Sequence, residues 1–152
     1  MPDPFEFDST SPRFGLPLLF AGQAQKEVFV NEALSIADAL LHCAVESVLS
    51  SPPASPADGA NWIVGPSASD AWEDREDAIA CRQAGKWIFV APRDGLRAFN
   101  RETGQEHLFF GGWQIIDVPV EPIGGLVVDV EARAAIADLV FALRASGVFP
   151  VT

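Results

Sequence analysis

The chain has 152 residues, of which 49% are hydrophobic, and its formal net charge is −11. This length and hydrophobic content predict one globular domain with a buried core and exclude a disordered chain. The acidic balance argues against nucleic-acid binding and against an anionic membrane surface, because both partners require a basic face. No apolar run is long enough for a transmembrane helix, and the N-terminus lacks a signal-peptide pattern, so we expect synthesis in the cytoplasm without membrane insertion.

Residues 1–21 combine prolines with large apolar side chains, among them Phe14, Leu16 and Leu18. Proline removes a backbone donor and disfavours a helix, so an extended arm is predicted. The arm is too apolar for a free tail. We expect it to dock in a groove, either on its own domain or on a neighbouring subunit.

A helix is predicted within residues 22–50, with Asn31 as its N-cap. Apolar residues recur from there at heptad spacing: Val30, Leu34, Ala37, Leu41, Ala44 and Val48. The pattern fits either an ordinary buried helix or a helix that also joins subunits in a symmetric bundle. Four polar residues precede this helix: Gln23, Gln25, Lys26 and Glu27. We expect them to satisfy backbone groups where the arm meets the helix, or to pair across a subunit boundary. Ligand binding is the alternative.

Residues 61–116 contain short apolar runs separated by turn signals such as Gly65-Pro66 and Gly111-Gly112. Their spacing of about ten residues predicts an antiparallel β subdomain. Residues 117–152 are predicted to form a linker and a C-terminal helix, with Asp129 as N-cap and Gly147 just after its end. Its predicted apolar face comprises Ala132, Ile136, Leu139, Val140 and Leu143. The expected fold is therefore α+β, with an arm and helix, a small antiparallel sheet and a C-terminal helix in a single compact domain.

No catalytic, metal-binding or cofactor-binding motif is recognisable in the chain. The two cysteines and two histidines lack ligand spacing, and the carboxylates of residues 71–78 are expected to form a solvated turn. The sequence therefore predicts a protein that is not an enzyme and has no metal or cofactor. An acid/base pair from Glu73 and Glu76 is the enzymatic alternative.

Aromatic residues are concentrated in the β region, which contains all four tryptophans. Exposed tryptophan beside polar groups is typical of sugar-binding surfaces, because ring faces stack on the apolar faces of pyranoses. Trp62, Trp87 and Phe89 are expected in the core, whereas Trp72 and Trp113 are expected to be exposed. The predicted glycan-binding residues are Trp72, Trp113, Arg93, Asp94 and His107. The predicted docking or oligomer residues are Phe14, Leu16, Leu18, Gln23, Gln25, Lys26, Glu27, Leu34, Leu41 and Val48.

Three sequence blocks resemble a phage-derived family of unknown function. They are PRFGLPLLFAGQAQKEVFVNEAL (12–34), WIVGPSASDAW (62–72) and DAIACRQAGKWIFVAPRDGLRAF (77–99), and GGLVVDVEARAAIADLVFALRASG (124–147) is also similar. The family is associated with phage tail fibres and with the spikes or fibres of gene transfer agents. The resemblance implies a head-spike or tail-fibre base or adaptor, assembled into a phage-like particle that is released from the cell.

This resemblance also implies partners. They are copies of the chain in a trimer or pentamer, other particle proteins at a capsid vertex or fibre, and cell-surface polysaccharide. Two alternatives remain open at this point. One is a free-standing carbohydrate-binding module, and the other is a glycan-degrading enzyme.

Overall fold

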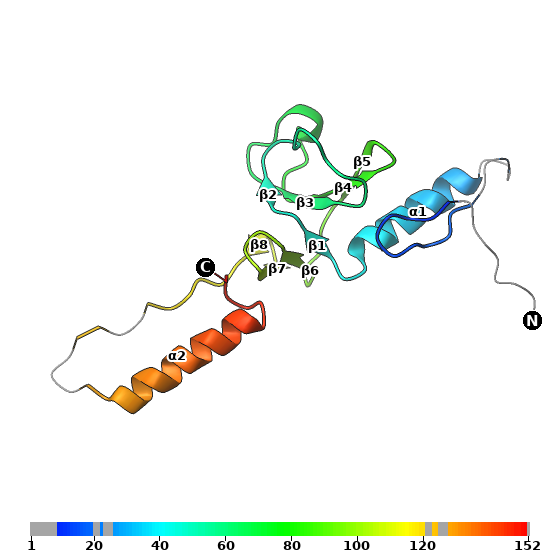
Figure 1. Ribbon diagram of the computed structural model, residues 1–152. Helices are drawn as coiled ribbons and strands as arrows, with labels where there is room; N and C mark the ends of the chain where they lie inside the picture. Colours follow the sequence, from blue (N-terminus) through cyan, green and yellow to red (C-terminus); the bar gives the residue numbers. More distant parts are fainter. Residues whose placement is uncertain (1–8, 20–21, 23–25, 121–122, 125–127, 152) are drawn as a thin grey trace, which may run out of the picture. The chain divides into compact units, whose positions relative to one another are not determined.

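The computed structural model describes residues 9–19, 22, 26–120, 123–124 and 128–151 (Figure 1). Its contacts divide the chain into two compact units, residues 1–92 and residues 93–152, so the predicted β subdomain over 61–116 is shared between them. The predicted α+β class is confirmed by two helices and several short strands among the described residues. No helix in this part of the chain has the length and apolar character needed to cross a membrane.

Helix α1 (Lys26–Leu40) begins and ends earlier than the sequence pattern predicts. Asn31 lies inside the helix and is not its N-cap. Its side-chain amide exchanges two hydrogen bonds with the backbone N and O of Leu19, at 2.8 and 3.0 Å. The helix ends before His42, whose φ of 45° is incompatible with a continuing helix. The predicted heptad stripe is therefore wrong beyond Leu40.

Residues 9–19 fold back on α1 and do not form an extended arm. Asp38, 2% exposed, accepts hydrogen bonds from Ser11 Oγ at 2.6 Å, Phe14 N at 2.7 Å and Arg13 N at 3.0 Å. The Arg13 guanidinium donates to the carbonyls of Asp38, Ala39 and His42 at the end of the helix. We call Ser11, Arg13, Phe14 and Asp38 the Asp38 clasp. It satisfies carbonyls that a helix C-terminus otherwise leaves without partners.

Unit 1 also contains β1 (Ala44–Val45), β2 (Val48–Leu49), β3 (Asn61–Val64), β4 (Ile79–Gln83) and β5 (Lys86–Val90). The order in its sheet is β2-β3-β4-β5, and β2 runs parallel to β3 while the other pairs are antiparallel. Both faces of β3 and most of β4 are buried. One face holds Trp62, Val64 and Ala80, and the short helix η1 (Asp70–Trp72) adds its own tryptophan to that side. The other face holds Ile63, Ile79 and Cys81, and α1 packs on β4.

Unit 2 contains three antiparallel strands, β6 (Arg97–Asn100), β7 (Gln105–Phe109) and β8 (Trp113–Gln114). Residues 147–151 return to β7: Glu106 N donates to Gly147 O at 2.7 Å, and Gln105 Nε2 donates to Val148 O at 3.0 Å. Gly104 has a φ of 67°, and a Cβ there would lie 2.8 Å from Val151 Cγ1. This turn therefore requires glycine for both conformation and space.

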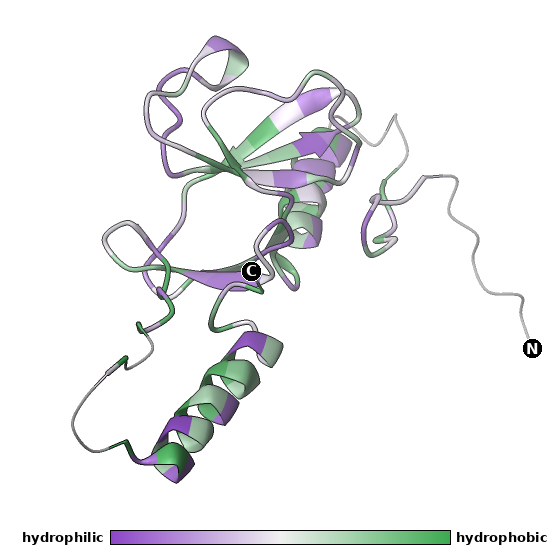
Figure 2. Ribbon diagram, turned by 60° about the vertical axis from the view of Figure 1, so that its left-hand side comes forward, coloured by the Kyte–Doolittle hydropathy of each residue, from purple (hydrophilic) through white to green (hydrophobic). Residues whose placement is uncertain are grey.

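Helix α2 (Val130–Ala145) lies in unit 2 with both predicted caps confirmed. Asp129 accepts a hydrogen bond from Ala132 N at 2.8 Å, and Gly147 follows the helix with a φ of 75°. Val140 is the one buried residue of the helix. Green hydrophobic segments recur along the whole of α2 in Figure 2, separated by purple hydrophilic ones. Most of the apolar surface of α2 is thus open to solvent.

Candidate functional site

The tryptophans of unit 1 form a buried cluster and not a sugar-binding platform. The Trp72 ring is 0% exposed and lies 5.2 Å from Trp87 and 6.4 Å from Trp62, measured between ring centroids. The expectation that Trp72 is exposed is wrong, because η1 turns its ring under the sheet, where burial of a large apolar ring is favourable. The expected core positions of Trp62, Trp87 and Phe89 agree with the structure.

The acidic residues of η1 and of the loop after it are exposed, and the chain turns sharply there. Asp70, Asp74 and Asp77 each have φ between 55° and 65°, a conformation that aspartate tolerates better than most residues. Glu76 Oε1 accepts a hydrogen bond from Ala68 N at 3.0 Å, so this carboxylate helps to close the loop. The Arg75 guanidinium lies 5.2 Å from the centroid of the Phe89 ring, beside an open depression of about 200 Å³. Within the described part of the chain, no cluster of three or more potential metal ligands occurs.

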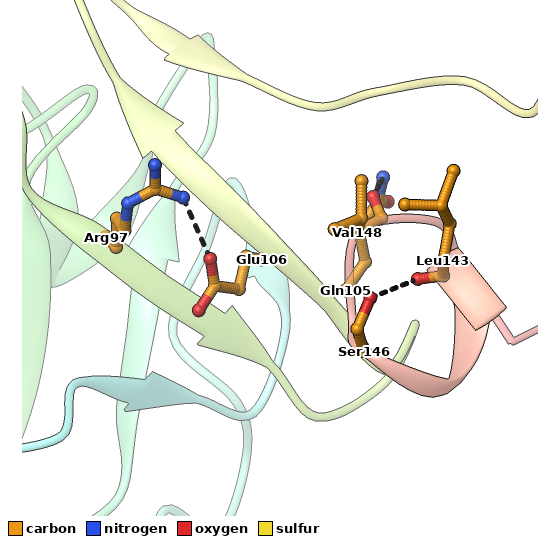
Figure 3. Close-up of polar contacts among 6 residues, drawn as sticks. All are labelled: Arg97, Gln105, Glu106, Leu143, Ser146 and Val148. Carbon is orange, nitrogen blue, oxygen red and sulfur yellow. Dashed lines mark hydrogen bonds and ion pairs between the residues drawn. The ribbon is translucent and has the colours of Figure 1, made fainter.

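A second depression lies on unit 2 and is mainly apolar. Its volume is about 200 Å³, and it is lined by Arg97, Glu106, Leu108, Gln114, Ile115, Ile116 and Val148. Arg97 on β6 and Glu106 on β7 form an ion pair of 2.9 Å, and Figure 3 shows their side chains directed toward each other. Both side chains are well exposed, so the pair contributes little to stability. An apolar floor beside an exposed ion pair suits the docking of an apolar side chain.

The remaining predicted glycan residues all belong to unit 2. Trp113 is half-buried, with its ring centroid 5.3 Å from that of Phe109 and 6.5 Å from that of His107. Arg93 and Asp94 are exposed, and Asp94 Oδ1 accepts a hydrogen bond from Gly111 N at 2.9 Å. Trp113, Arg93 and Asp94 therefore keep accessible surface, whereas His107 is buried and does not present its ring to a ligand.

His107 occupies a polar position inside unit 2. Its Nε2 lies 3.3 Å from Asn100 Nδ2, and burial lowers the pKa of its imidazole below 6.5. The folded chain therefore binds a proton on His107 less readily than the unfolded chain does. At higher pH His107 is neutral in both the folded and the unfolded chain and does not change the free energy of unfolding. Any destabilisation by this group therefore begins as the pH falls through the pKa of His107 in the unfolded chain.

We expect the free energy of unfolding to fall by at most about 1.4 kcal/mol per pH unit through this group as the pH is lowered from about 6.5. Urea unfolding at about pH 7.5 and pH 5.5 measures it, and His107→Gln should remove this part of the pH dependence. His42→Gln is the control, because His42 is exposed. Equal pH dependence in the native and His107→Gln chains would contradict the assignment.

The predicted docking and oligomer residues are dispersed over unit 1. Phe14 and Leu16 belong to the segment folded on α1, and Leu18 is half-buried in the same segment. Glu27 Oε1 accepts a hydrogen bond from Gly22 N at 3.2 Å, which confirms that it satisfies a backbone group before the helix. Lys26 is the first residue of α1. Gln23 and Gln25 lie outside the described residues.

Three further residues were expected to share a helical stripe. Leu34 is on α1, but Leu41 follows the end of the helix, and Val48 lies in β2. The structure therefore does not bring the three together on one helix. The cause is tertiary. Arg13 binds the carbonyls of the last helical turn, and the chain then continues into β2, which pairs with β3.

The two cysteine thiols and the Asp38–Arg13 hydrogen-bond network belong to no predicted site. Cys43 and Cys81 are free thiols, and burial raises the pKa of both, that of Cys81 to about 12. Neither is a ready nucleophile. Asp38 and Arg13 carry the densest hydrogen bonding in unit 1, and sequence analysis missed them. The available signal was an aspartate in an otherwise apolar stretch of helix.

Helix α2 and the described residues before it carry many exposed apolar side chains in unit 2. Large apolar side chains that stay exposed here are Ile115, Ile116, Val120, Ile123, Val128, Val130, Ile136, Leu139 and Phe141. Exposed apolar side chains in such number are typical of a surface that contacts another protein. We therefore take α2 as the candidate functional site, together with the neighbouring unit 2 depression.

A family model described as "Protein of unknown function (DUF2793)" matches residues 30–114. This is more than half of the 152 residues. The match includes all the strands of both units but neither residues 9–19 nor α2. The description names no activity. A search of curated proteins gives no match.

Proposed function

This chain belongs to the DUF2793 family of proteins of unknown function, and we propose that it is a structural component of a phage-like particle. Its role is that of a head-spike or tail-fibre base or adaptor, which supports or performs binding to cell-surface polysaccharide. It acts without catalysis, as a homo-oligomeric trimer or pentamer held by other particle proteins. It is made in the cytoplasm and leaves the cell within the particle. The particle context is drawn from the three sequence blocks described above.

The observation that carries this proposal is the exposed apolar surface of α2. Leu139 and Phe141 are 59% and 74% exposed, and both lie on a well-capped helix. A helix with apolar residues all around it is normally covered, and here its own unit buries only Val140. A chain that permanently joins an assembly would cover this surface with another protein.

Adsorption to polysaccharide is the part of the proposal that depends on Trp113. Its half-buried ring lies on the same unit as Arg93 and Asp94, which supply exposed hydrogen-bonding groups. Stacking on a sugar face needs only one accessible ring face, so partial burial is compatible with binding.

The proposed role as a particle component can be tested with particles that are purified from a producing strain on a density gradient. We expect the chain to sediment with DNA that is protected from nuclease, and we expect particles from a deletion strain to lose most of their adsorption to recipient cells. Trp113→Ala should leave incorporation unchanged and reduce adsorption by about tenfold if its ring contributes a typical stacking energy of about 1.4 kcal/mol. An abundant cytoplasmic protein in the same lysate is the control for carry-over. Complete, adsorbing particles that lack the chain would disprove the proposal.

A further inference from the structure

Unit 1 contains two buried thiols, Cys43 and Cys81, that come from separate elements. Cys43 is 8% exposed and lies in the turn between α1 and β1, whereas Cys81 is 4% exposed and lies on β4. Side chains alternate along a strand, so Cys81 shares one face of the sheet with Ile79, and α1 packs on this strand. The chain therefore brings the end of α1 and the thiol of β4 to the same part of the unit.

The Asn61 side chain connects these two places. In the antiparallel pair of β3 and β4, Asn61 is directly opposite Cys81. Opposite residues have their side chains on the same face, with Cβ atoms about 5 Å apart. Asn61 Nδ2 donates to Ala39 O and to Ala44 O, both at 3.3 Å. These two carbonyls flank residues 40–43, so the amide beside Cys81 also holds the turn that carries Cys43.

The electrostatics of the two thiols agree with this geometry. Burial raises the pKa of Cys81 to about 12, the charge of Cys43 adds to the rise, and the Arg13 guanidinium opposes it. Burial also raises the pKa of Cys43, and Arg13 again opposes the rise. The same guanidinium donates to His42 O at 3.1 Å, directly before Cys43. Because such effects weaken with distance, each thiol lies within the electrostatic range of the other and of one guanidinium.

These two thiols have no competing assignment in the described part of the chain. No cluster of three or more potential metal ligands occurs there, and the one contact of Cys81 Sγ is a weak one to Ile79 O at 3.8 Å. The sequence has only these two cysteines, so each is the other's sole candidate for an internal disulfide. We propose that Cys43 and Cys81 form an intramolecular disulfide when the chain meets a disulfide oxidant, and that both stay reduced in a reducing compartment.

The reaction is a thiol–disulfide exchange with a small-molecule disulfide such as glutathione disulfide. The Cys43 thiolate attacks one sulfur of the oxidant, which forms a mixed disulfide and releases one glutathione thiolate. The Cys81 thiolate then attacks Cys43 Sγ and releases the second glutathione thiolate. The two cysteine protons pass to the two leaving thiolates. Two protein thiols are thus oxidised to one disulfide, and one glutathione disulfide is reduced to two thiols.

Burial sets both the order and the rate of these steps. Cys43 attacks first because it is the more exposed of the two thiols. Both thiols are protonated and covered at neutral pH, so the reaction needs a local opening of the chain and should take hours. The bond then joins the end of α1 to β4. It should lower the equilibrium constant for unfolding of unit 1 by about 30-fold or more, measured by urea unfolding with and without a reductant.

Peptide mapping of the purified full chain tests the bond itself. The folded chain is incubated with glutathione disulfide, remaining thiols are alkylated, and the mass is measured. We expect a loss of two hydrogen atoms and no alkylation. Trypsin places Cys43 and Cys81 in different peptides, residues 27–75 and 76–82. These peptides should remain joined until a reductant is added.

Two matched variants test the order of attack. Cys81→Ala should keep one glutathione on Cys43, whereas Cys43→Ala should be labelled at less than about a tenth of that rate, because Cys81 is more deeply buried. Circular dichroism checks that each variant is folded. Equal labelling of the two variants would overturn the assigned order.

Three results with the native chain would overturn the disulfide, and they need no variant. They are two thiols that stay free, dimers linked through a cysteine, and joined peptides that form only in urea. The inference goes beyond the proposed function and does not depend on it. A chain that forms the internal disulfide but is absent from particles would refute the proposed function and leave this inference intact.

Discussion

Replacing Trp72 by alanine is expected to lower the free energy of unfolding of unit 1 by about 3–5 kcal/mol, the largest effect of any single substitution considered for this chain. The ring is 0% exposed and contacts both Trp62 and Trp87, so its removal leaves a cavity that the β3–β4 sheet can only partly fill. An indole Nε1 that is buried without a hydrogen-bond partner also leaves with the ring, which offsets a small part of the loss.

Urea unfolding followed by circular dichroism measures this effect, because tryptophan fluorescence itself changes in the variant. Hydrogen exchange should show that lost protection is concentrated in β3 and β4. Phe110→Ala is the control: Phe110 is 64% exposed, and its loss should change stability by less than about 0.5 kcal/mol. A Trp72→Ala chain within about 1 kcal/mol of the native chain would show that Trp72 is not part of the core.

Asp38→Ala is expected to cost about 3 kcal/mol, from the loss of three hydrogen bonds to a buried carboxylate. The backbone amides of Arg13 and Phe14 and the hydroxyl of Ser11 would lose their acceptor. The Arg13 guanidinium and Leu19 keep their own hydrogen bonds to this part of the chain, so residues 11–14 should loosen locally on α1.

Two measurements separate this local effect from general unfolding. Amide exchange at Arg13 and Phe14 should accelerate far more than exchange in β4. Glu32→Ala removes an exposed carboxylate from the same helix and should leave both the stability and the exchange rates close to those of the native chain. If exchange at Arg13 and Phe14 is unchanged in Asp38→Ala, the Asp38 clasp does not hold the segment.

The strands within residues 61–114 were predictable from local sequence signals, whereas β1 and β2 lie where a helix was predicted. The runs near Trp62, Ile79, Trp87, Phe99 and Leu108 correspond to strands, and the turn glycines Gly85, Gly95, Gly104 and Gly111 have the positive φ that such turns favour. The caps of α2 were also predictable, because Asp129 and Gly147 act through neighbours within a few residues. These features depend on short-range chemistry that a sequence displays directly.

The failures all involve distant partners. The heptad spacing continued past Leu40, but the helix stops there because Arg13 reaches its last carbonyls from far away in the sequence. Trp72 lies among polar residues, and nothing local shows that its loop closes under β3.

The Asp38 clasp also bears on the order in which the chain is made. All its hydrogen bonds join residues within 11–42, so both halves emerge from the ribosome before β3 does. Helix α1 therefore receives its C-terminal cap from residues translated earlier, and this step needs no residue of unit 2. A nascent chain can in this way protect the end of its first helix while the rest of the protein is still being synthesised.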